Sequence, residues 1–277
     1  MTAKSGFRTL ASLAIVWLAL GCGVSAFGDT LRLGGSGSTT ALAKLLASAY
    51  NAKYPQDSII VTPALGTAGG LKALAVNAVS VALVSRPLTG SESGLRATEF
   101  ARTPFVLTVA ATNPKSNVGF AELAALLAAT EPTWPDGTRV RWVLRPAQDN
   151  DSKIVASFSP AVAKAWDAAR QRNGAYISAT DEETISSIQR LPGGIGFTTL
   201  GQILADKRPL KALSIEYMVP NVSAIQDGSY PYFKRHFLVS AAQVTPVIER
   251  FMAFAVSPEA QALLSAHGSW VGTFQNR

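Results

Sequence analysis

The part of the chain that decides the fold is a short apolar run that leads into glycines and hydroxyl residues: Thr30-Leu31-Arg32-Leu33-Gly34-Gly35-Ser36-Gly37-Ser38-Thr39-Thr40. From residue 41 to residue 54, apolar residues recur at helical spacing. The stretch therefore predicts a strand over 30–33, a glycine-rich turn and a helix over 41–54.

The same succession follows twice more. Residues 58–62 read as a strand, residues 66–70 as a second glycine-rich turn and residues 71–77 as a helix. Residues 79–84 form a third apolar run, which ends at Ser85-Arg86-Pro87. Three such units in about sixty residues predict an α/β fold with a mostly parallel sheet, whose loops meet at the carboxyl ends of the strands.

The pattern of the remaining residues predicts a second lobe, after which the chain returns to the first lobe. Beyond a strand over 105–111, we expect helices over 120–129, from 153 and over 160–172, and one ending at 186–191. Strands are expected over 140–144, 193–197 and 230–240, before closing helices over 245–256 and 258–267. We therefore expect one lobe from residues 27–106 plus 232–277 and another from residues 107–231.

Composition restricts the class of protein. Of the 277 residues, 48% are hydrophobic and 16% charged, which is typical of a packed globular body. The net charge of +7 is spread along the chain without a run of five or six Lys or Arg, so we expect no nucleic-acid partner. We expect a monomer.

The amino terminus has the pattern of a secretory signal. Lys4 and Arg8 precede the apolar residues 10–20, and small residues end at Ala26. Residues 1–26 are therefore predicted to be cleaved after export to the periplasm. The only cysteine, Cys22, follows Ala-Leu-Gly, which loosely resembles a lipobox, so lipid anchoring at Cys22 is the alternative.

The loop at residues 35–40 suits a negatively charged ligand. Amides at a helix start have no partner within the helix, and the helix dipole favours an anion there. The hydroxyls of Ser38, Thr39 and Thr40 could add donors, and Arg86 would lie beside them. The alternatives are that the hydroxyl residues only cap the helix and that Arg86 is a solvated charge.

Enzyme motifs are incomplete. Residues 34–38 do not form a nucleophile elbow, and the glycines fit neither a P-loop nor a dinucleotide fingerprint. His236 and His267 have no neighbours at metal-ligand spacing. We therefore predict no catalytic residue, no metal site and no cofactor.

Several segments, taken in order and together, resemble the substrate-binding proteins of phosphate ABC transporters, which are the PstS-like branch of the periplasmic binding proteins. The segments that carry the resemblance are residues 35–40, 66–72, 84–88, Arg145 with its loop, 192–197, 230–231, and 251–254 with 257–261. The resemblance implies a two-lobed type II periplasmic binding protein, in which each lobe is a mixed, mostly parallel sheet flanked by helices. It also implies membrane permease subunits as partners.

The resemblance further implies which residues contact the oxyanion. These are Thr39, Thr40, Thr67, Ser85, Arg86, Arg145 and the loop Asp149-Asn150-Asp151-Ser152. The sequence departs from the family at two places, because Arg86 stands where many members have an aspartate and residues 148–151 replace a Gly-Ser-Gly-Thr type turn.

Two hypotheses remain open for Asp149 and Asp151: one of them accepts a proton from a protonated oxyanion and so rejects sulfate, or both cap the following helix. The sequence thus predicts an exported, non-catalytic protein that captures inorganic phosphate or a similar oxyanion for an importer. The alternatives are the same fold with another anion, such as a phosphonate, a molybdate-like oxyanion or an organic acid, and an exported phosphate-ester hydrolase.

Overall fold

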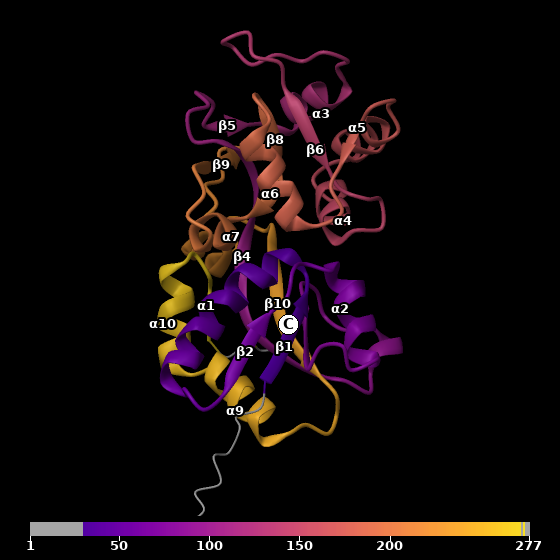
Figure 1. Ribbon diagram of the computed structural model, residues 1–277. Coiled ribbons are helices and arrows are strands. Elements are labelled where there is room, and N and C mark those ends of the chain that lie inside the picture. The colour runs from indigo at the N-terminus through magenta and orange to yellow at the C-terminus, as the bar shows by residue number, and fades with distance from the viewer. Residues whose placement is uncertain (1–29, 273, 275–277) are drawn as a thin grey trace, which may run out of the picture.

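A computed structural model describes residues 30–272 and residue 274. The predicted signal segment and Cys22 lie outside this range. Figure 1 shows two lobes, with the long strands β4 (Arg96–Ala110) and β10 (Phe233–Ser240) at the passage between them. Over the described range, no helix is both long and apolar enough to span a bilayer.

The first lobe combines the start and the end of the chain. Its elements are β1 (Thr30–Gly35), α1 (Gly37–Lys53), β2 (Ser58–Val61), α2 (Gly66–Ala75), β3 (Val81–Val84), the 3-10 turn η1 (Gly90–Glu92), α9 (Pro246–Ala255) and α10 (Pro258–Ala266). Strand β1 lies between β2 and β3 and is parallel to both. Leu33 and Leu42 pack in its core with Phe251 from α9, so the terminal helices close the lobe.

The second lobe is built from the middle of the chain. Its elements are β5 (Asn117–Val118), α3 (Phe120–Ala128), β6 (Arg141–Leu144), α4 (Asn150–Ala156), α5 (Pro160–Arg170), β7 (Tyr176–Ile177), α6 (Asp181–Arg190), β8 (Gly194–Thr199), α7 (Leu200–Ala205), β9 (Leu210–Ile215) and α8 (Val222–Asp227). Trp166 and Phe197 are buried in a separate apolar core. The mixed α/β class is confirmed, whereas the exact lobe boundaries remain a prediction.

Strand β4 joins the two sheets without interruption. Residues 96–104 pair antiparallel with β10, and residues 105–109 pair antiparallel with β8. The predicted strand over 105–111 was therefore too short at its start. The missed half carries Glu99 and Arg102, which pair with each other, and these charged residues obscured the apolar pattern of a strand.

Helices α1 and α2 begin earlier than the sequence predicted. Helix α1 starts at Gly37 and α2 at Gly66, so the predicted glycine-rich turns supply the first helical turns. The glycine at position 70 permits this packing, because a Cβ there would lie 2.6 Å from the Cα of Gly35. Helix α2 can thus rest directly on the end of β1 and present its first turn at the sheet edge.

Candidate functional site

A cleft of about 430 Å³ separates loops of the two lobes. The first lobe lines it with Ser36, residues 65–69, Ser85 and Arg86. The second lobe contributes Pro146, residues 148–151, Lys153 and Ala179, and Lys234 comes from β10. Because each wall belongs to a different lobe, a solute held here would contact both.

Hydroxyl groups from two neighbouring loops meet on the first-lobe wall. The Oγ1 atom of Thr67, in the first turn of α2, lies 3.2 Å from the Oγ of Ser85, which follows β3. The backbone N–H of Ser85 also donates to Thr67 Oγ1 at 3.3 Å. From the opposite wall, Asn150 Nδ2 donates to the Ser85 carbonyl at 3.3 Å and so connects the lobes.

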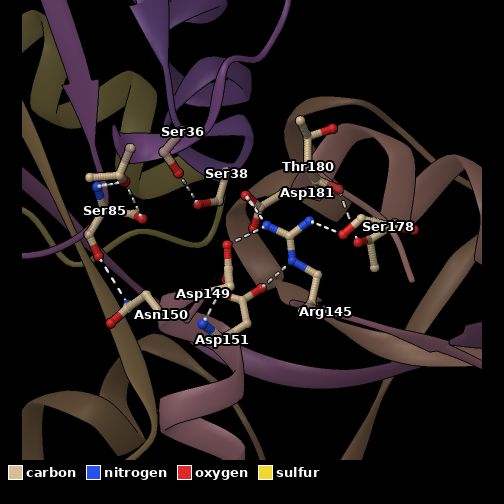
Figure 2. A network of polar contacts seen from close by, with 12 residues as sticks. Ser36, Ser38, Ser85, Arg145, Asp149, Asn150, Asp151, Ser178, Thr180 and Asp181 are labelled. Carbon is tan, nitrogen blue, oxygen red and sulfur yellow. Dashed lines mark hydrogen bonds and ion pairs between the residues drawn. The ribbon is translucent and has the colours of Figure 1, made fainter. Parts of the chain in front are cut away.

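Arg145 follows β6 and is buried behind the second-lobe wall, with 1% of the residue exposed. Figure 2 shows its guanidinium among three carboxylates. Its Nη2 donates to Asp149 Oδ2 at 2.9 Å, and its Nη1 donates to the carbonyl of Ser178 at 3.0 Å. Asp151 and Asp181 each bring an oxygen within 3.7 Å of this guanidinium.

Lys234 is the second buried cation of this cluster. Its Nζ pairs with Asp151 and, at 2.6 Å, with Asp181. Two cations thus face three carboxylates, and removing one partner of such a buried pair is strongly destabilising. The cluster joins β10 to the amino-terminal turns of α4 and α6, so it ties the crossing strand to the second lobe.

The two carboxylates that pair with Lys234 have opposite pKa shifts. Burial raises the pKa of Asp151 to about 7, although the charge of Lys234 opposes this shift. Burial also acts on Asp181, but the charges of Lys234 and Arg145 outweigh it and hold the pKa of Asp181 below its usual range. Near neutral pH, Asp181 is therefore ionised while Asp151 can exchange a proton.

Asp149 has a double role at the start of α4. Its Oδ1 accepts a hydrogen bond from the backbone N–H of Asp151 at 2.9 Å, so it is the N-cap of the helix. Its Oδ2 accepts from Arg145. Asp151 lies within the first turn and pairs with Lys234, so the capping hypothesis describes Asp149 and not Asp151.

The predicted contact residues fall into two groups. Six of them line the cleft, namely Thr67, Ser85, Arg86, Asp149, Asn150 and Asp151. The guanidinium of Arg86 makes two hydrogen bonds to the carboxylate of Glu92, so its charge is already compensated.

The other five, Ser38, Thr39, Thr40, Arg145 and Ser152, are buried behind the lining. Thr39 Oγ1 lies 2.9 Å from Nδ1 of His236, and burial lowers the pKa of that histidine to about 3. Thr40 Oγ1 donates to the carbonyl of Ser36, within the first turn of α1. The Ser152 hydroxyl donates to the carbonyl of Arg145. These side chains therefore shape the walls from behind.

Sequence reasoning missed Lys234, Asp181 and Ser36. Lys234 is a lone lysine in a strand of otherwise mostly buried residues, and such a charge needs an acidic partner. Asp181 begins the run Asp181-Glu182-Glu183, which resembles ordinary helix-capping acids. The buried lysine was the signal that could have directed attention to a matching carboxylate.

The chain matches a family model described as a PBP superfamily domain over residues 24–259. The protein belongs to the PBP superfamily. Among curated proteins, no match is found.

Solved structures of this superfamily fold resemble the chain at low identity. A putative phosphate ABC transporter substrate-binding protein from Clostridium perfringens, with bound phosphate, has a TM-score of 0.72 and 18% identity, covering 88% of this chain and 100% of the other. An ABC-type phosphate transport receptor from Vibrio cholerae has a TM-score of 0.58 and 19% identity, covering 87% and 100%. The predicted two-lobed PBP fold is thereby confirmed.

A similar fold also occurs in a regulatory domain. The regulatory domain of Synechocystis CcmR, in complex with 2-PG, has a TM-score of 0.50 and 15% identity, covering 82% of this chain and 95% of the other. Likeness at this level of identity describes the fold alone. The ligand of this PBP superfamily member must therefore be argued from its own cleft.

Proposed function

We propose that this protein is an exported, non-catalytic solute-binding protein that captures a phosphate-type oxyanion between its lobes for an ABC importer. The observation that carries the proposal is the cleft wall where the first turn of α2, the Thr67 hydroxyl and the Ser85 hydroxyl meet, opposite Asn150 and Lys234. Helix N-terminal amides, hydroxyls and an ammonium group are suitable donors for a small oxyanion.

Closure follows from the division of these donors between the lobes. A solute that contacts Thr67 on one side and Asn150 on the other gains both sets of contacts only when the cleft is closed. Closed protein would then dock on the membrane permease. The signal at residues 1–26 would bring the protein to the periplasm, with a lipid anchor at Cys22 as the alternative.

Asp151 supports a protonated oxyanion as the ligand. Its buried carboxylate lines the cleft, and a ligand that carries a hydroxyl group could donate a hydrogen bond to it. Sulfate has no proton to donate near neutral pH and would meet only repulsion from an ionised Asp151. Selection of phosphate over sulfate is therefore expected.

Isothermal titration calorimetry of the purified protein with phosphate and with sulfate tests this function. We expect binding of phosphate, weak or absent binding of sulfate, and a loss of roughly tenfold in phosphate affinity in Thr67→Val, which removes one hydroxyl. Thr138→Val, in a second-lobe turn, is the matched control and should bind as the wild type does. Absence of phosphate binding at millimolar concentration would reject the proposal.

The charge of the buried cluster favours a second candidate ligand for the same kind of solute-binding protein. Because three carboxylates face two cations there, a ligand with less negative charge, such as a phosphonate monoester or an organic acid, is also favoured. A thermal-shift panel of anions separates the two candidates, since the ligand that binds raises the melting temperature most.

A further inference from the structure

The guanidinium of Arg145 is covered by Asp149 on the side of the cleft. Asp149 lines the cleft and its side chain is 24% exposed, whereas the side chain of Arg145 is 2% exposed. The remaining donors of Arg145 face Ser178, Asp151 and Asp181 within the buried cluster. An anion that enters the cleft therefore meets the carboxylate of Asp149 before it can reach this cation.

The two carboxylate oxygens of Asp149 accept hydrogen bonds from two different donors. Oδ2 accepts from Arg145 Nη2, and Oδ1 accepts from the backbone N–H of Asp151 at the start of α4. A guanidinium and a backbone amide, each bonded to a separate oxygen of one anionic group, are the arrangement with which proteins hold an oxyanion. The side chain thus fills this position with an anion that belongs to the chain itself.

Among the three carboxylates around Arg145, only Asp149 is placed so that it could leave. Asp151 and Asp181 have side chains that are 1% and 4% exposed, and both are held by Lys234. Asp149 borders a cleft of about 430 Å³, into which its carboxylate can turn. Rotation of Asp149 would free one donor on Arg145 and one amide on Asp151 together.

We propose that Asp149 is a specificity-determining residue, an internal carboxylate that competes with the incoming oxyanion for Arg145 and for the amide of Asp151. This inference rests on the proposed function, because it concerns the same cleft. Only a ligand that offers two oxygens to these two donors displaces the carboxylate fully. Asp149 therefore lowers the affinity for every anion and disfavours those that cannot replace both of its hydrogen bonds.

Calorimetric titration of inorganic phosphate into Asp149→Asn tests the inference. Asparagine is a good N-cap residue, so α4 keeps its cap, but the neutral amide competes poorly for a guanidinium. We expect phosphate affinity to rise by about tenfold or more, because a charged hydrogen bond no longer opposes the ligand. Asp149→Ser, another preferred N-cap residue with a shorter side chain, should act in the same direction and serves if the first variant does not fold.

Asp136→Asn is the matched control. Asp136 also accepts a backbone hydrogen bond, from Thr138 at 2.8 Å, but it lies in an exposed turn of the second lobe. The control makes the same change in net charge, so any rise in affinity that it shows is a general electrostatic effect. A rise in Asp149→Asn that exceeds the control supports the inference.

The outcomes separate the inference from the proposed function. If the wild type binds phosphate and the Asp149 variants bind it no more tightly than the control does, the inference is wrong and the function stands. If only the Asp149 variants bind phosphate, the inference is supported, and phosphate is not the solute that the wild type carries. If neither the wild type nor the variants bind phosphate, both proposals are rejected.

Discussion

At the scale of single residues, the contact of Lys234 with Asp151 and Asp181 determines how the stability of the protein depends on pH. The side chains of Lys234, Asp151 and Asp181 are all at most 4% exposed. Burial raises the pKa of Asp151, whereas the cations overcome the effect of burial at Asp181 and lower its pKa. The folded protein therefore holds a proton on Asp151 more tightly than the unfolded chain does, and it does the reverse at Asp181.

The stability of the protein should consequently fall as pH rises through the pKa of Asp151. A group with a raised folded-state pKa stabilises the fold fully below its unfolded-state pKa, and this contribution is lost as pH rises through about 7. Between pH 5 and pH 8 we expect Asp151 to cost about 2 kcal/mol in the free energy of unfolding. Asp181 stays ionised between pH 5 and pH 8, so it adds no pH dependence to the free energy of unfolding in this range.

Urea unfolding of Asp151→Asn in phosphate-free buffer checks this prediction. Whatever the cost of removing one partner of Lys234, the free energy of unfolding of the variant should fall less than that of the wild type between pH 5 and pH 8, because position 151 no longer titrates. Equal pH dependence in the two proteins would show that Asp151 does not carry the titration.

The sequence could predict part of the candidate site but not its internal pairing. The positions of Thr67 and Ser85 were predicted because glycine-rich and polar turns after strands meet at one sheet edge, whereas the loop at 149–151 was expected only from the family resemblance. Asp181 and Lys234 were missed because they are 53 residues apart and only folding brings them together. The Glu92 partner of Arg86 could not be inferred from composition either.

At the scale of elements, helix α2 positions the first-lobe wall through its contact with β1. A Cβ on Gly70 would lie 2.6 Å from the Cα of Gly35 and 2.8 Å from the carbonyl oxygen of Gly34. These are backbone atoms, so the helix itself would have to move. Because Thr67 lies in the first turn of α2, this movement would also disturb the cleft.

Gly70→Ala should therefore lose stability and ligand affinity together. We expect a loss of about 2 kcal/mol in the free energy of unfolding, as in other overpacked sites, and weaker phosphate binding. Gly94→Ala is the control, because a Cβ at that position meets nothing within 4 Å. Chemical denaturation and calorimetry measure both effects, and an unchanged Gly70→Ala protein would contradict this account of α2.

The regular elements of the first lobe were largely predictable, because strand, turn and helix alternate there with clear apolar periods. Shorter elements of the second lobe were not predicted, including β5, β7 and α8, which have two, two and six residues. Such segments are too short to show a period, and their hydrogen bonds depend on partners distant in sequence. The first turns of α1 and α2 were missed because glycine has low helix propensity.

At the scale of the whole molecule, direct side-chain contacts join the two lobes. Glu182, at the start of α6, pairs with Lys44 of α1 at 2.9 Å and accepts from the backbone N–H of Ala64 at 3.2 Å. Asn150, also in the second lobe, donates a hydrogen bond to the carbonyl of Ser85 in the first lobe. These contacts therefore favour the closed arrangement of the lobes.

Glu182→Gln should shift the ligand-free protein toward an open state. A partly exposed ion pair contributes up to about 1 kcal/mol, which changes the ratio of open to closed protein by about fivefold. Small-angle scattering should therefore report a larger radius of gyration for the variant and a larger decrease when phosphate is added. Glu183→Gln is the control, because Glu183 accepts from Ala179 within its own lobe. Identical scattering of both variants would exclude the contact as a determinant of closure.

The proposed function requires that both lobes hold one oxyanion at once. A crystal structure of the protein grown with phosphate and without sulfate tests it most directly. We predict a phosphate ion in the cleft, within about 3 Å of Thr67 and Ser85 on one side and of Asn150 on the other. A cleft without phosphate at saturating concentration, or a phosphate bound to one lobe alone, would contradict it.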